Sequence, residues 1–262
     1  MEILIYIAAI IAGLIMGLTG AGGSILSVPV FTYLAKIDVV TATAYSLFVV
    51  GLTAFAGTLT HLKRKTLRIK EGLYYGIPSV ISIILTREYF VQHLPEIFVK
   101  FNGYEITKQN FLMGLFSIFM IAAGLSMIKE KKIAVEENNP EINLLSLSLQ
   151  GLLLGVVMGL LGAGGGFLIV PALVQIAKMP IKSAIATSMM IISVNAFSGF
   201  FGSIQFVEIN WGFLISFGAL MVAGVIAGSI FSTKINAKIL KPAFGYFIIL
   251  ISILIIYKEF IN

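Results

Sequence analysis

A segment of fourteen residues occurs twice in this chain, at an offset of 142 positions. Residues 17–30 read GLTGAGGSILSVPV and residues 159–172 read GLLGAGGGFLIVPA, so nine of the fourteen positions are identical. Both copies lie inside long stretches without Asp, Glu, Lys or Arg. A glycine cluster interrupts a helix, and unwound backbone at membrane depth is tolerated only where protein buries it or it lines a cavity. The repeat therefore predicts two broken membrane helices beside a functional site.

The composition places the chain in a membrane. It is 58% hydrophobic and 11% charged, which leaves too little polar surface to coat a soluble protein of 262 residues. Two short uncharged runs, 72–86 and 242–257, are expected to cross as tilted spans or to thin the bilayer. Six longer uncharged runs can each cross a hydrocarbon core of roughly 30 Å: 3–35, 39–60, 109–128, 142–177, 183–207 and 209–233. We expect a multi-pass protein of the cell membrane whose partner is the lipid bilayer, not a nucleic acid.

The duplication extends beyond the glycine motif. Without a gap, the same offset pairs Ser46 with Ser188 and Thr53 with Asn195. We therefore expect a first transmembrane repeat at 1–130, a charged linker at 131–142 and a second repeat at 143–262.

Loop charge predicts how the two halves are oriented. The segment 61–70 carries five Lys and Arg residues, whereas its counterpart 203–210 carries none. Short basic loops stay cytoplasmic, so these equivalent loops are predicted on opposite sides, with loop 61–70 and linker 129–142 inside. This topology requires residues 3–35 and 142–177 each to form a hairpin. The expected fold is an all-α polytopic protein of two inverted-topology repeats, each a broken-helix hairpin with a Gly-rich turn plus three spanning helices.

The turns of these hairpins are candidate anion sites. Helices that start near Ser24 and Gly166 leave their first N–H groups without partners and carry partial positive charge there. Two such ends near the midplane would hold an oxyanion without a formal charge. The alternative is that the glycines serve only close helix packing, because Gly13 with Gly17, and the series Gly151, Gly155 and Gly159, have the spacing of small-residue contacts.

Polar side chains within the uncharged runs 39–60 and 183–207 are further candidates for the anion site. Ser46, Thr53, Ser188, Ser193 and Asn195 lie at equivalent or neighbouring positions of the repeat and could donate hydrogen bonds to an anion. Hydroxyls in membrane helices more often bond a carbonyl of their own helix, which is the alternative for each Ser and Thr. For Asn195 we favour function, because an amide is costlier to bury.

Few residues offer other chemistry. We expect Arg87 to extend to the interface and pair with Glu88, and binding of an oxyanion is the alternative. The chain has no cysteine, and His93 has no ligand pattern around it. We therefore expect no metal, no cofactor and no enzymatic activity. No Asp or Glu lies inside any of the uncharged runs, which argues against a buried acidic relay. The sequence does not choose a coupling ion or an oligomeric state.

Both halves contain the pattern Gly-x-x-Gly-Ala-Gly-Gly-x-x-x-x-x-Pro, which is followed by Ala44-Tyr45-Ser46 in the first half and by Ala186-Thr187-Ser188 in the second. In these motifs the chain resembles the TauE/SafE family of sulfite-exporter-like membrane proteins. The resemblance implies transport of a small anion, such as sulfite or an organosulfonate. We expect a secondary transporter that works by alternating access around a midplane site, with an anion channel of opposed half-helices as the alternative. The predicted substrate-binding residues are Thr19, Gly20, Ala21, Gly22, Gly23, Ser24, Ser46, Thr53, Gly162, Ala163, Gly164, Gly165, Gly166, Ser188 and Asn195.

Overall fold

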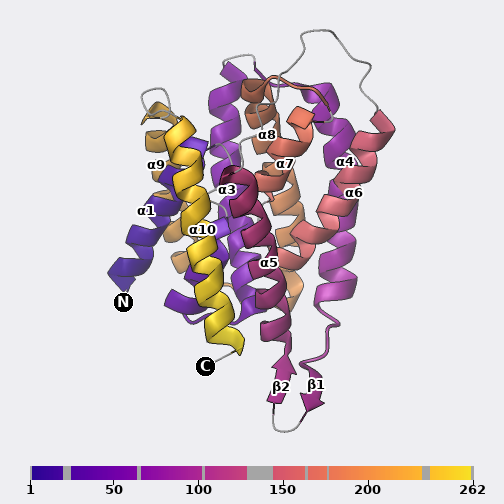
Figure 1. Cartoon of the computed structure of the whole chain (residues 1–262), viewed down its shortest axis with the longest axis vertical. Coiled ribbons are helices and arrows are strands. Elements are labelled where there is room, and N and C mark those ends of the chain that lie inside the picture. The colour runs from indigo at the N-terminus through magenta and orange to yellow at the C-terminus, as the bar shows by residue number, and fades with distance from the viewer. Residues whose placement is uncertain are drawn as a thin grey trace.

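A computed structural model describes the fold of the chain at residues 2–19, 25–63, 66–101, 104–128, 144–162, 165–175, 177–231 and 237–260. Helices dominate this part of the chain and run roughly along one direction (Figure 1). They are α1 (Glu2–Thr19), α2 (Ser27–Pro29), α3 (Val39–Lys63), α4 (Ile69–Leu85), α5 (Lys108–Ile128), α6 (Leu144–Leu161), α7 (Gly166–Gln175), α8 (Ile181–Phe201), α9 (Trp211–Phe231) and α10 (Ala237–Phe260).

Within the described residues, five helices are long and apolar enough to cross a membrane. They are the helical stretches Val39–Leu62, Lys108–Ile128, Leu144–Leu161, Ser183–Phe206 and Trp211–Phe231. A shorter apolar helix covers Ile3–Leu18. The all-α, multi-pass prediction is therefore confirmed.

The duplication is visible in the order of the helices. α1, α3 and α4 begin at residues 2, 39 and 69, and α6, α8 and α9 begin 142 positions later, at residues 144, 181 and 211. Their packing repeats as well. α1 packs on α9 as α6 packs on α4, and α3 packs on α9 as α8 packs on α4. Each contact thus recurs with the two halves exchanged.

Equivalent helices at the centre of the molecule run antiparallel. A Cβ atom on Gly57, late in α3, would lie 2.6 Å from the sulfur of Met189, early in α8. A Cβ atom on Gly199, late in α8, would lie 3.0 Å from Leu47, early in α3. The last helices of the two halves also lie side by side in opposite directions, because α5 leads away from the β-hairpin and α10 ends near that level (Figure 1).

The Gly-x-x-x-Gly series bring backbones into contact. A side chain on Gly13 of α1 would overlap the carbonyl of Met221 in α9, and a Cβ atom on Gly155 of α6 would lie 2.5 Å from the Ser79 carbonyl oxygen in α4. Apolar burial does not drive helix association inside a bilayer, so this close approach supplies the van der Waals contact that holds the pairs together. Packing is thus confirmed as one role of these glycines.

The stretch between the uncharged runs 72–86 and 109–128 forms regular structure. A π-helical segment, Thr86–Val91, extends α4, and strands β1 (Ile97–Phe101) and β2 (Tyr104–Thr107) form an antiparallel hairpin. The hairpin lies beyond the helices, at one end of the molecule (Figure 1).

Candidate functional site

Gly162 and Gly165 of the second glycine motif are buried between two helical arms. α6 ends at Leu161 and α7 begins at Gly166, as predicted. Gly162 and Gly165 both have φ of +63°, a conformation that glycine adopts without strain. A Cβ atom on Gly165 would lie 2.5 Å from the Met158 side chain. The turn therefore needs glycine at both positions, for conformation and for space.

The first motif has the same two arms. α1 ends at Thr19, helical structure resumes at Ile25, and α2 continues into a π-helical segment, Val30–Leu34. Shortly after each short arm, one residue adopts positive φ: Lys36 (56°) and its repeat equivalent Lys178 (50°). The predicted site residues Gly20, Ala21, Gly22, Gly23, Ser24, Ala163 and Gly164 lie outside the described residues.

Thr53 and Asn195 each face the hairpin of their own half. The Thr53 hydroxyl lies 3.4 Å from the sulfur of Met16 in α1, and the Asn195 amide nitrogen lies 3.7 Å from the sulfur of Met158 in α6. Met16 and Met158 are themselves repeat equivalents. Met158 contacts Gly165 as well, so Asn195 and the second turn meet at one side chain. Among the described residues, no hydrogen bond joins Thr53 to Asn195, so their place in a common site stays a prediction.

Two of the predicted polar residues use their hydroxyl groups in hydrogen bonds within their own helices. Thr53 donates to carbonyls of its own helix, at Val49 and Val50, and Ser188 donates to Ile185. These contacts fit the packing alternative.

Two of the predicted residues keep an atom without a partner. The Ser46 hydroxyl and the Asn195 carbonyl oxygen are buried and have none in the described structure. Asn195 also donates to the Ser79 hydroxyl across helices, at 2.6 Å. The repeat placed Asn195 near the site, but no local signal indicated Ser79.

The prediction for Arg87 was wrong. Its side chain is 0% exposed, and within the described residues it makes no ion pair with Glu88. Nε donates to the Ser203 hydroxyl at 2.8 Å, and Nη1 donates to the Thr43 hydroxyl at 3.0 Å and to the Gly159 carbonyl at 3.3 Å. Burial was missed because these partners are distant in sequence and converge on Arg87 only in the fold.

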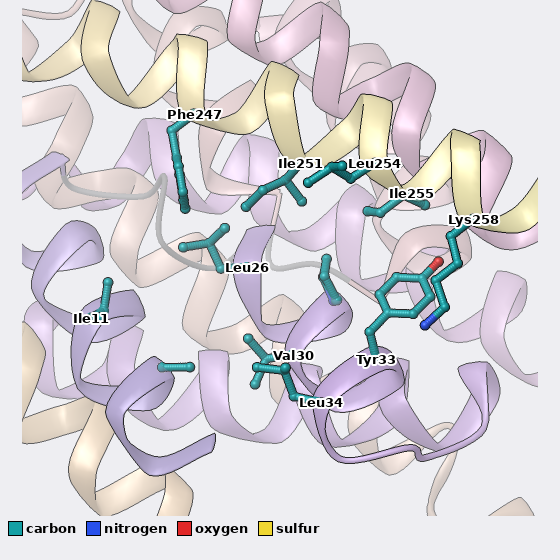
Figure 2. A pocket seen from close by; sticks show the side chains of 12 residues that line it. Ile11, Leu26, Val30, Tyr33, Leu34, Phe247, Ile251, Leu254, Ile255 and Lys258 are labelled. Carbon is teal, nitrogen blue, oxygen red and sulfur yellow. The ribbon is translucent and has the colours of Figure 1, made fainter. Parts of the chain in front are cut away.

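A cavity of about 400 Å³ lies between α1, the short arm of the first hairpin and α10 (Figure 2). Its walls are apolar, with Leu26, Val30 and Ile251 among them. Tyr33 and Lys258 lie together at one end, where the ammonium is 4.3 Å from the ring centre. None of the predicted site residues that the structure describes lines this cavity, and its apolar walls would not solvate an oxyanion.

A second cavity, of about 440 Å³, is more polar. Its lining includes Tyr6, Lys36, Tyr45 and Asn210, and the described site residues are absent from it too. Across the described part of the chain, no three His, Asp or Glu side chains come together as a metal site would require.

Comparisons with known proteins agree with the fold. Residues 5–255 match the family described as sulfite exporter TauE/SafE. A "Probable membrane transporter protein" of Methanocaldococcus jannaschii is 30% identical, over 90% of this chain and 85% of the relative. Similarly named proteins of Xylella fastidiosa strain Temecula1 and Bacillus subtilis are 26% and 28% identical, over 95% and 98% of this chain and 92% and 97% of the relatives. No solved structure matches the chain. The chain therefore belongs to the TauE/SafE sulfite exporter family and is a membrane transporter of that type.

Proposed function

We propose that the protein is a secondary transporter of a small anion, namely a sulfur oxyanion or an organosulfonate, and that it works by alternating access. The family description names sulfite, and relatives that cover nearly the whole chain are named as transporters. The substrate class thus comes from the family, and the chain's own geometry supports a site that can accept an anion.

The observation that carries the proposal is the second hairpin. Gly162 and Gly165 are buried and have positive φ, and α7 starts directly after Gly165, at Gly166. The first N–H groups of a helix lack intrahelical partners and carry partial positive charge, which attracts an oxyanion. Asn195 reaches the same turn through Met158, so a polar amide adjoins the helix start.

Alternating access is supported by the relation between the halves. Repeat-equivalent residues meet at the crossing of α3 and α8, where the Ser193 hydroxyl donates to the Gly51 carbonyl at 3.2 Å. Because α3 and α8 are antiparallel, we infer a two-fold axis in the membrane plane and therefore inverted topology. Such halves can exchange conformations and open a central site to each side in turn. In this orientation, loop 61–70 and linker 129–142 face the cytoplasm.

Flux of radiolabelled sulfite into proteoliposomes tests the proposal. We expect saturable uptake with counter-transport, and loss of uptake in Gly165→Val, because valine disfavours positive φ and would overlap Met158. Gly76→Val is the matched control, since a Cβ atom there meets only Ile191, at 3.9 Å. Absence of flux in the wild-type protein would contradict the proposal, and large unitary currents would favour the channel alternative.

A further inference from the structure

Arg87 places a full positive charge inside the protein with no carboxylate among its described partners. Its three partners, the hydroxyls of Ser203 and Thr43 and the Gly159 carbonyl, are all neutral. Arginine keeps its charge in proteins, so the cost of desolvation is not relieved by loss of a proton. Ionisable groups in membrane segments are normally paired or functional. The missing counter-charge therefore has to come from outside the described chain.

The guanidinium has donors to spare. It carries five N–H groups, of which Nε uses one and Nη1 uses two in the bonds just described. Nη2 is buried and has no partner in the part of the chain that the structure describes. Both Nη2 protons are thus open to an acceptor.

Its neighbours fix the guanidinium in place without competing for that acceptor. Ser203 donates its own proton to the Gly199 carbonyl at 2.9 Å, and Thr43 donates to the Val40 carbonyl at 2.8 Å. Each hydroxyl oxygen is therefore left to accept from Arg87. Because these hydrogen bonds already fix the guanidinium, it loses little further conformational entropy when it binds an anion.

Arg87 also adjoins the turn of the second hairpin. Gly159 opens the repeated motif, and a Cβ atom on Gly162 would overlap the Thr43 side chain. Thr43 thus contacts both Gly162 and Arg87. The π-helical segment that carries Arg87 is a local distortion often found at functional sites.

The first hairpin has no such group. The offset of 142 places Ser229 at the position equivalent to Arg87, Ile185 at that of Thr43 and His61 at that of Ser203. A purely structural element of a duplicated fold would be expected twice. Arg87 has no arginine at its repeat-equivalent position, so the surroundings of the two hairpins differ in this cationic group.

We propose that Arg87 binds the transported anion, with its Nη2 group as the free donor. The inference rests on the proposed function and names the group that recognises the substrate. The chemical class is an oxyanion such as sulfite or a sulfonate, because Nη2 is left free to donate a short, charge-assisted N–H···O hydrogen bond to an anionic oxygen.

Thermal stability of the purified protein with and without sulfite tests the assignment, because a ligand that binds only the folded state raises the melting temperature. The variants are Arg87→Gln, which removes the charge, and Arg87→Lys, which keeps the charge without the fork. Arg68→Gln is the matched control, because Arg68 is more than half exposed and contacts Glu71 at 3.5 Å. We expect sulfite to stabilise the wild type and Arg68→Gln equally, Arg87→Lys at roughly tenfold higher concentration, and Arg87→Gln not at all.

A structural role for Arg87 predicts a different result. It would lower the melting temperature of Arg87→Gln without sulfite and leave the sulfite-dependent increase intact, which would overturn the assignment. An unchanged sulfite dependence in Arg87→Lys would also overturn it, even if Arg87→Gln failed to fold. If both Arg87 variants transport sulfite at the rate of the wild type, this inference is overturned and the proposed function stands. Absence of sulfite binding and flux in the wild type would contradict both.

Discussion

The two halves of the protein share a fold and differ in charge. Their helices begin at the same offset and pack in the same pairs, with Met16 beside Thr53 in one half and Met158 beside Asn195 in the other. The region beside the second turn holds Arg87, whereas the equivalent position holds Ser229. Under the proposed function, the symmetry would serve the conformational change, and Arg87 would confine recognition of the anion to one side.

The largest expected effect concerns the topology, because a thiol introduced in one loop should be labelled from one face of the membrane and not from the other. Lys36 and Lys178 are repeat equivalents, both exposed and both at positive φ. Inverted halves place them on opposite faces of the membrane. Since the chain has no cysteine, Lys36→Cys and Lys178→Cys introduce single thiols without background. In inside-out and right-side-out vesicles, an impermeant maleimide should label Lys36→Cys from outside and Lys178→Cys from the cytoplasmic side. Labelling of both from one face would contradict the inverted arrangement.

The next largest effect is on sulfite uptake, and it follows from the charge difference between Arg87 and its repeat equivalent Ser229. Arg87→Gln should reduce sulfite uptake roughly tenfold or more, because a hydrogen bond to a charged group contributes about 1.5–3 kcal/mol. Ser229→Ala, at the equivalent position, should leave uptake unchanged, because the Ser229 hydroxyl donates to Ile226 of its own helix. Initial rates in proteoliposomes measure both. Equal losses in the two variants would show that the anion site is symmetric.

Close packing should be equally sensitive in the two halves. Gly13 and Gly155 are repeat equivalents, and each faces the backbone of a neighbouring helix. Substitution of either by alanine should destabilise the protein by about 1–3 kcal/mol, because the added methyl group forces the helices apart. Unfolding in SDS, followed by circular dichroism, measures the loss. A loss confined to one variant would break the structural equivalence of the halves.

The crossing helices give the smallest effect. Asn195→Ala should cost about 0.6 to 2 kcal/mol, because it removes the bond to Ser79 between helices. Thr53→Val should cost less, since Thr53 bonds carbonyls of its own helix. The same unfolding assay compares them. A larger cost for Thr53→Val would mean that its contact with Met16 outweighs the interhelical bond.

Much of the fold could be predicted because local features specify it. Uncharged runs located the spans, and the glycine motif at 159–172 located the turn before α7. The π-helical segment and the β-hairpin in 86–107 were not predicted, since polar residues after a span also suit an ordinary loop. The surroundings of Arg87 could not be predicted either. Beside Glu88 at the end of a short span, an arginine has the local sequence of an interfacial residue, and only the approach of Gly159 and Ser203 buries it.

Selenite offers the most direct test of the central claim, because it has the pyramidal geometry of sulfite and selenium scatters anomalously. Crystals of the wild-type protein with ordinary methionine, soaked in selenite, should show one anomalous peak beside Arg87, with selenite oxygens within about 3 Å of Nη2. Crystals of Arg87→Gln soaked in the same way should show no peak there. A peak at Ser229 of equal height, or a peak only at a site remote from the second turn, would contradict the claim that one half of this duplicated transporter binds the anion.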